Sequence, residues 1–255
     1  MKRTLALLLL MIGAGAPGGA QMLNVYSEFA RIDAQGNVTA PEMPREILSP
    51  ALLRNGFTSF QVVVQVPANT PYVLRIGQNP DKAAKVTLYR GAEGRLQRVA
   101  EPVSGNSTET FWMDIWMDKS DPVHRIKVEP EIEVNGDWVI YPMEMRVREN
   151  IVPDVAAIPS AGSEPSSAAP FELLRAYLCA SQPPPPVPEI KTPEDLHLRN
   201  ARQDLAMAAA LSNESREELR KWMGGCNARP SNDPEFYLHV RDYFFTPLWM
   251  KLTRK

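Results

Sequence analysis

The feature that most constrains the fold is an alternating run at residues 57–66, FTSFQVVVQV. One side of an extended chain there carries apolar side chains: Phe60, Val62, Val64 and Val66. The other side carries Ser59, Gln61 and Gln65, with Val63 as the exception. A two-residue period of β-branched and aromatic residues is typical of a β-strand that faces a core. The run therefore predicts a central strand of a β-sheet.

The alternation recurs in most of the stretches between residues 21 and 150. Further strands are predicted at residues 25–32, 72–76, 86–90, 95–99, 108–118, 124–134 and 138–148. Asn135 and Gly136 separate the last two, and this pair favours the positive φ angles of a tight hairpin turn. Short strands joined by turns predict an antiparallel β-sandwich, immunoglobulin-like in class, over residues 21–150.

A change of composition follows the predicted sandwich. Residues 151–170 are rich in Pro, Ser and Ala and show no period, which predicts a linker. Helices are predicted beyond it at residues 171–181, 192–211, 214–223 and 232–245, the second of them beginning at Thr192 and Pro193. The sequence thus predicts an α+β protein of two domains, the second a small all-α domain at residues 171–255.

Both the N-terminus and the cysteines predict an exported protein. Lys2 and Arg3 precede an apolar run, and small residues lead to Ala20, which is the pattern of a signal peptide at residues 1–20 cleaved near Ala20. The two cysteines, Cys179 and Cys226, form an even set without a Cys-x-x-Cys motif, so one disulfide is predicted in an oxidising compartment. The destination is the periplasm or the extracellular space.

Charge and motifs exclude several classes of function. With 28 basic and 30 acidic residues the net charge is −2, which argues against a nucleic-acid or anionic-membrane binder. No later apolar run is long enough to span a bilayer. The three histidines lack metal-ligand spacing, and no nucleophile motif or phosphate loop is present. No metal, cofactor or catalytic residue is therefore predicted.

One strand nevertheless carries a candidate ligand surface. Trp112, Asp114, Trp116 and Asp118 fall on one face of the predicted strand at residues 108–118. Exposed indoles beside carboxylates are typical of sugar-binding surfaces, whereas buried indoles would belong to the core or lie under the helices. The two carboxylates would be roughly 13 Å apart along the strand, wider than the roughly 5–9.5 Å that glycoside hydrolysis uses.

The C-terminus is both aromatic and basic. Residues 243–255, YFFTPLWMKLTRK, fit either a membrane-peripheral tail or a final helix docked on the helical core. The second interpretation is favoured, because a terminal helix commonly buries its aromatic side chains and leaves its basic end in solvent.

The leading functional prediction is an exported, non-enzymatic interaction or structural protein with a protein or cell-surface partner. The first alternative is a carbohydrate- or cell-wall-binding module, with a polysaccharide on the Trp112 and Trp116 face. The second alternative is a hydrolase whose site is not visible in the sequence. Exposure of the two indoles separates the first two, and a cleft with converging Asp, Glu or His would favour the third.

Overall fold

The computed structural model describes residues 22–39, 48–92, 94–122, 124–154, 170–181, 186 and 188–227. The predicted signal peptide, most of the predicted linker, the last predicted helix and the C-terminal tail lie outside the described residues. The boundaries predicted at residues 20, 150 and 170 therefore stay predictions.

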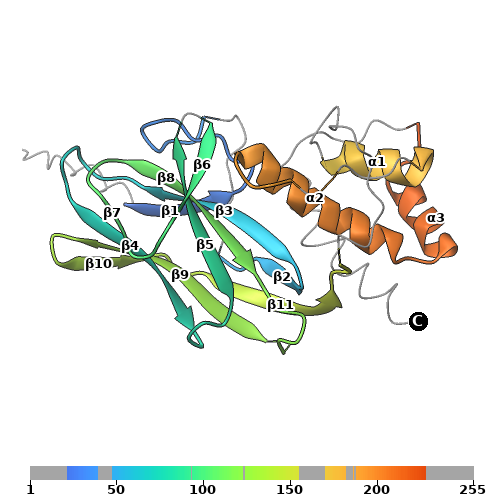
Figure 1. The fold of residues 1–255 in the computed structure, drawn as a ribbon, viewed down its shortest axis with the longest axis horizontal. Coiled ribbons are helices and arrows are strands. Elements are labelled where there is room, and N and C mark those ends of the chain that lie inside the picture. The colour runs from blue at the N-terminus through green and yellow to red at the C-terminus, as the bar shows by residue number, and fades with distance from the viewer. Residues whose placement is uncertain are drawn as a thin grey trace, which may run out of the picture.

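The described chain is mostly β and forms two sheets (Figure 1). The five-stranded sheet has the order β1 (Leu23–Ser27), β3 (Phe57–Val64), β8 (Glu109–Trp116), β5 (Lys85–Ala92) and β6 (Arg95–Val99). The six-stranded sheet has the order β2 (Ala51–Arg54), β11 (Glu144–Ile151), β9 (Arg125–Val134), β4 (Tyr72–Asn79) and β7 (Val103–Gly105), and β10 (Asp137–Ile140) pairs with β9. The pairing is antiparallel throughout, apart from the parallel pair of β2 and β11.

Side chains from both sheets fill one core between them. Phe111, Met113 and Ile115 of β8 point inward and are fully buried. Val62 and Val64 of β3 enter the same core from the neighbouring strand. Each Å² of apolar surface removed from water stabilises the fold by about 25 cal/mol, so this core is the main stabilising contribution to the sandwich.

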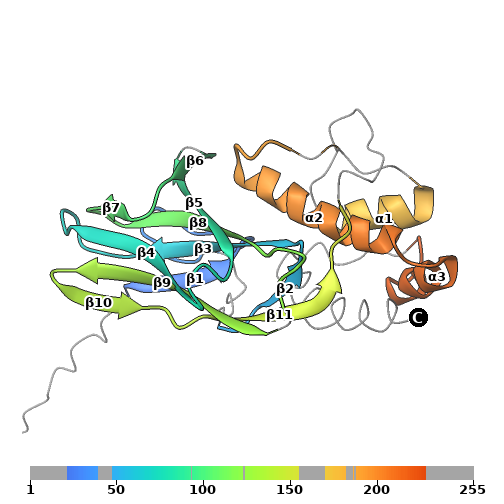
Figure 2. The ribbon, with the colours of Figure 1, turned by 60° about the horizontal axis from the view of Figure 1, so that its bottom comes forward.

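Three helices follow in the described chain: α1 (Pro170–Ala180), α2 (Pro193–Ala209) and α3 (Asn213–Trp222). Thr192 caps α2 in a reciprocal pair with Asp195, and Pro193 occupies the first turn, as predicted. Ser212 caps α3. Figures 1 and 2 show the helices gathered at one end of the strands, with the N-terminal half of α2 reaching back along them.

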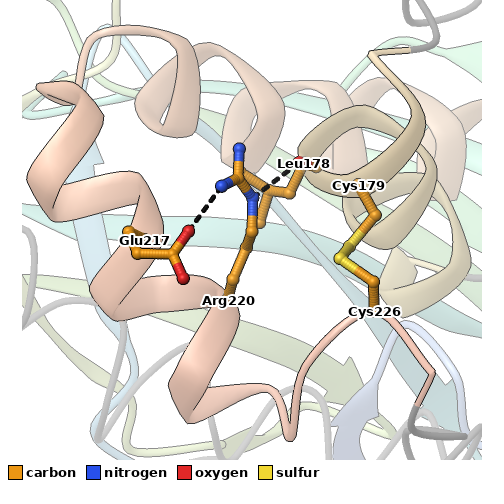
Figure 3. Close-up of a disulfide and its surroundings, with 5 residues drawn as sticks. All are labelled: Leu178, Cys179, Glu217, Arg220 and Cys226. Carbon is orange, nitrogen blue, oxygen red and sulfur yellow. Dashed lines mark hydrogen bonds and ion pairs between the residues drawn. A yellow bond between two sulfur atoms is a disulfide. The ribbon is translucent and has the colours of Figure 1, made fainter.

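The predicted disulfide is confirmed and lies within the helices. Cys179 of α1 bonds Cys226, which follows α3, and the two residues are 47 positions apart in the sequence (Figure 3). Beside it, Arg220 of α3 donates to the Leu178 carbonyl of α1 at 2.7 Å and to Glu217 at 2.6 Å. α1 and α3 are thus joined by a covalent bond and by an arginine. No helix in the described ranges is long and apolar enough to cross a membrane.

The predicted class, a two-domain α+β protein with an immunoglobulin-like sandwich and a separate all-α domain, is wrong. The sheets hold five and six strands, more than the seven to nine that immunoglobulin folds divide between two sheets. The helices also share apolar clusters with the strands: Leu205 of α2 packs with Leu53 of β2 and with Val152, and Leu196 packs with Trp112. The helices therefore pack directly on the strands, and the structure does not show a two-domain, immunoglobulin-like layout.

Candidate functional site

The most concentrated group of polar side chains lies between α2 and the outer face of the five-stranded sheet. We call it the interface cluster; its members are Glu28, Ser59, Asp114, Arg199 and Asn200. All five are buried, Asp114 to 4% exposure and Arg199 to 8%. They come from the turn after β1, from β3, from β8 and from α2, so the cluster exists only in the assembled fold.

The guanidinium of the interface cluster is paired with the Asp114 carboxylate. Arg199 donates from Nη1 to Oδ2 of Asp114 at 2.8 Å and from Nη2 to Oδ1 at 2.6 Å. Ser59 donates to the same carboxylate at 2.9 Å. Asn200 bridges to the other side, donating to Glu28 at 2.9 Å and to Ser59 at 3.1 Å. A two-pronged, hydrogen-bonded pair of this kind is the arrangement that buried opposite charges require.

Aromatic side chains close the interface cluster on two sides. The Arg199 guanidinium stacks 3.8 Å from the centre of the Phe57 ring. Tyr89 of β5 lies nearby; burial, and after it the negative charge of Asp114, raises the pKa of Tyr89 above 10.0.

Two further side chains of α2 bond to the backbone of the strands. Gln203 accepts from the Phe57 amide at 2.5 Å and donates to the Phe57 carbonyl at 2.9 Å, so it replaces a neighbouring strand at the start of β3. His197 donates from Nε2 to the Glu28 carbonyl at 2.9 Å, and its ring lies 4.6 Å from that of Phe29. These contacts fix α2 on the sandwich.

Ser, His, Asp and Glu thus converge at the junction of helix and sheet, which is the place where the hydrolase alternative would require a site. Nucleophilic catalysis needs a serine hydroxyl within hydrogen-bond reach of a base, usually a histidine. Here the Ser59 hydroxyl donates to Asp114, while His197 bonds a backbone carbonyl. The geometry therefore fits a structural junction better than a nucleophile with its base. The described ranges contain no group of three or more His, Cys, Asp or Glu side chains that could hold a metal ion.

The structure divides the four residues predicted as a ligand surface. Trp112 and Asp114 lie together under α2, and Trp112 is 7% exposed and packs against Leu196. Trp116 is half-buried, with its ring 6.4 Å from that of Phe57. Asp118 accepts from the amide and hydroxyl of Ser120 at 2.8 and 2.6 Å, bonds that lower its pKa. Their role in ligand binding stays a prediction; in this arrangement α2 occupies the space in front of Trp112.

The outer face of the six-stranded sheet is a second candidate surface. We call its central part the open face; it comprises Arg75, Glu131, Glu133, Trp138 and Ile140. Trp138 and Ile140 of β10 are 43% and 51% exposed, which is unusual for large apolar side chains on one short strand. In the register of the strands, Trp138 lies opposite Glu133, and Ile140 lies opposite Glu131.

The indole of Trp138 on the open face is held in place by Arg75. The Arg75 guanidinium of β4 stacks 3.8 Å from the Trp138 ring centre, and its Nε donates to Glu131 at 2.8 Å. Gly77 makes room for that carboxylate, because a Cβ at this position would lie 2.3 Å from Glu131 Oε1. Trp138 therefore has one face on a fixed guanidinium and remains substantially exposed.

Sequence reasoning predicted only part of the interface cluster and did not single out the open face. The alternation at residues 138–148 places Val139 inward and therefore Trp138 outward, and this signal pointed to the open face. Arg199, Asn200 and Gln203 gave no such signal, because polar residues on a helix ordinarily face solvent.

Neither a protein-family model nor a curated protein matches this sequence. Among solved structures, the chain is similar to a family 123 glycoside hydrolase from Clostridium perfringens, with 10% identity and a TM-score of 0.39 over 62% of this chain and 32% of that one. It is also similar to the Bacteroides ovatus GH5 xyloglucanase in complex with a heptasaccharide, with 8% identity and a TM-score of 0.28 over 51% of this chain and 23% of that one. The chain thus spans a third or less of each enzyme. Likenesses this weak carry no inference about function.

Proposed function

We propose that this chain is an exported, non-enzymatic interaction protein that binds its partner on the open face. One observation carries the proposal: the outer face of one sheet is covered by α2, whereas the other sheet presents Trp138 and Ile140 to solvent. Trp is among the residues most enriched at binding surfaces, since it offers a large contact area with few rotatable bonds.

Export is supported by two features of the chain. The sequence begins with the pattern of a signal peptide, and the Cys179–Cys226 disulfide is compatible with an oxidising compartment. The non-enzymatic part is supported by the interface cluster. Its carboxylate, guanidinium and amide groups bond one another across the junction, so their hydrogen bonds hold α2 on the sheet.

The test compares three versions of the full chain, immobilised and incubated with cell-surface and secreted fractions of the source organism. The wild type is expected to retain material that excess soluble wild type displaces. Trp138→Ser with Ile140→Ser should abolish that retention. Ile151→Ser is the matched control, because Ile151 is 45% exposed but lies on β11, outside the open face. Equal retention by all three versions would refute the proposal.

A further inference from the structure

We infer that the open face is a binding site for an uncharged polysaccharide, with a pyranose ring stacked on Trp138. The inference rests on the function proposed above and names the class of partner. It moves the sugar surface away from Trp112, which α2 covers, to an indole that is 43% exposed. Three properties of the open face favour this ligand.

The first property is the flat, exposed indole of Trp138, which we call the platform. The exposed face of an indole carries the negative part of the ring quadrupole, which attracts the polarised C–H bonds on the flat face of a pyranose. Arg75 stacks against Trp138 at 3.8 Å and is itself bonded to Glu131, so the indole is ordered before a ligand arrives. Little side-chain entropy is then lost on binding, which is the general benefit of a pre-ordered site.

The second property is the ring of hydrogen-bonding groups around the platform. Glu133 lies opposite Trp138 in the strand register, so its carboxylate stands beside the indole. Glu131 and the half-exposed Arg75 lie one row further along the strands. Carboxylates accept from hydroxyl groups and guanidinium groups donate to them, so adjacent hydroxyls of a sugar find both kinds of partner.

The third property is the arrangement of charge. Three cations on this side of the sheet are paired with carboxylates: Arg75 with Glu131 at 2.8 Å, Lys127 with Glu129 at 3.5 Å and Arg125 with Glu144. Glu133 adds a further carboxylate, so the open face has one guanidinium and two carboxylates and offers no attraction to an anionic polymer. The hydroxyl groups of an uncharged ligand can bond to these groups without adding a charge.

The shape of the surface agrees with a chain ligand rather than a small molecule. Trp138 and Ile140 lie two residues apart on the same side of β10, about 7 Å along the strand. That distance is of the order of one sugar unit in an extended polysaccharide. We therefore expect Trp138 to carry one ring and Ile140 to contact the next.

The test is affinity gel electrophoresis of the full chain in native gels that contain hydroxyethyl cellulose, galactomannan, pullulan or the anionic polygalacturonate. We expect retardation by at least one of the three neutral polymers, with little change on adding about 0.5 M salt to a parallel solution assay. Trp138→Ala should weaken that binding by about tenfold or more, and Trp138→Phe, which keeps a ring, should weaken it less. Ile151→Ser should bind like the wild type.

Two sets of results would overturn the inference. One is binding to a neutral polymer that Trp138→Ala leaves unchanged while thermal unfolding shows that variant to be folded. The other is no binding to any neutral polymer, or binding to polygalacturonate alone that salt abolishes. The retention experiment above separates the two proposals: cell-surface material that is held through Trp138 and destroyed by protease would leave the interaction surface standing and replace the polysaccharide with a protein partner.

Discussion

The pair of Arg199 and Asp114 provides the strongest test of how the helices are attached. Replacing Arg199 by Met leaves a carboxylate of 4% exposure without its guanidinium, supported in the described cluster by the Ser59 hydroxyl. Removing one partner of a buried ion pair costs about 3–5 kcal/mol of unfolding free energy. Asp114→Leu is expected to cost a similar amount, because it leaves the guanidinium buried beside an apolar side chain.

The double variant, Arg199→Met with Asp114→Leu, removes both charges and should be far less destabilised than the two single losses added together. Replacing a buried pair by apolar side chains of similar size is often neutral. Such non-additivity is the sign of a direct interaction between the two positions.

Urea unfolding of the oxidised full chain measures these effects, followed by far-UV circular dichroism for the helices and by near-UV circular dichroism for the packing of the aromatic side chains. We expect one transition that both signals report at the same urea concentration, because helix and sheet share the cluster. Different urea midpoints for the two signals would show that helices and sheets unfold separately, which would contradict their attachment through the interface cluster. A loss below about 1 kcal/mol for Arg199→Met, or a double variant that loses the sum of the single values, would refute the role given to this pair.

Three other changes have defined outcomes. Cys179→Ala with Cys226→Ala opens a loop of 47 residues and should lower the unfolding free energy by up to about 4 kcal/mol, measured by the same urea series. Gly105→Ala places a Cβ 2.2 Å from the buried Tyr72 ring. We expect this variant to lose about 1–3 kcal/mol of unfolding free energy and to melt at a lower temperature. Gly136→Ala is the comparison for backbone strain alone, because the space around Gly136 is open but its φ is +87°. Burial raises the pKa of Glu101 above 4.5, so the folded chain binds this proton more tightly than the unfolded chain, and stability falls as the pH rises from 4.5 through the folded-state pKa. Glu101→Gln should flatten that part of the stability profile, and an unchanged profile would show that the carboxyl does not contribute.

The strands could be predicted where alternation is long and regular. The run around β8 was placed correctly, since Phe111 and Met113 enter the core while Trp112 and Asp114 face the other way. β2 and β7 were missed because four and three residues are too few to show a period. The predicted strand at residues 138–148 is two strands, β10 and β11, separated by a segment that contains Pro142.

The arrangement of the helices could not be predicted, because its decisive contacts join distant residues. One side of α2 is apolar and buries Leu205 and Ala208. The opposite side carries Arg199, whose partner Asp114 lies 85 positions earlier in the sequence. A polar helix face predicts exposure to solvent when its partner is unknown. A proline-rich stretch predicts a linker between domains. The first inference led to the separate all-α domain in the predicted fold class, whereas the linker at residues 151–170 stays a prediction.

The sequence indicates which tryptophans face away from the core, but not which of them is exposed to solvent. The indoles of Trp112 and Trp138 both lie on strand faces turned away from the core. The sequence does not reveal which sheet a helix covers, and that single fact decides which indole meets solvent. The prediction of an aromatic surface thus chose the sheet that α2 covers.

The interface cluster also makes the docking of α2 depend on strand register. Its strand-side members come from the turn after β1, from β3 and from β8, and all of them precede α2 in the chain. A slip of one residue between β3 and β8 would turn Ser59 and Asp114 to opposite faces of the sheet. Arg199 would then lose its two hydrogen bonds to Asp114, and the docking of α2 would be weakened. Docking of α2 therefore stabilises the sheet only when β3 and β8 pair in the register observed here.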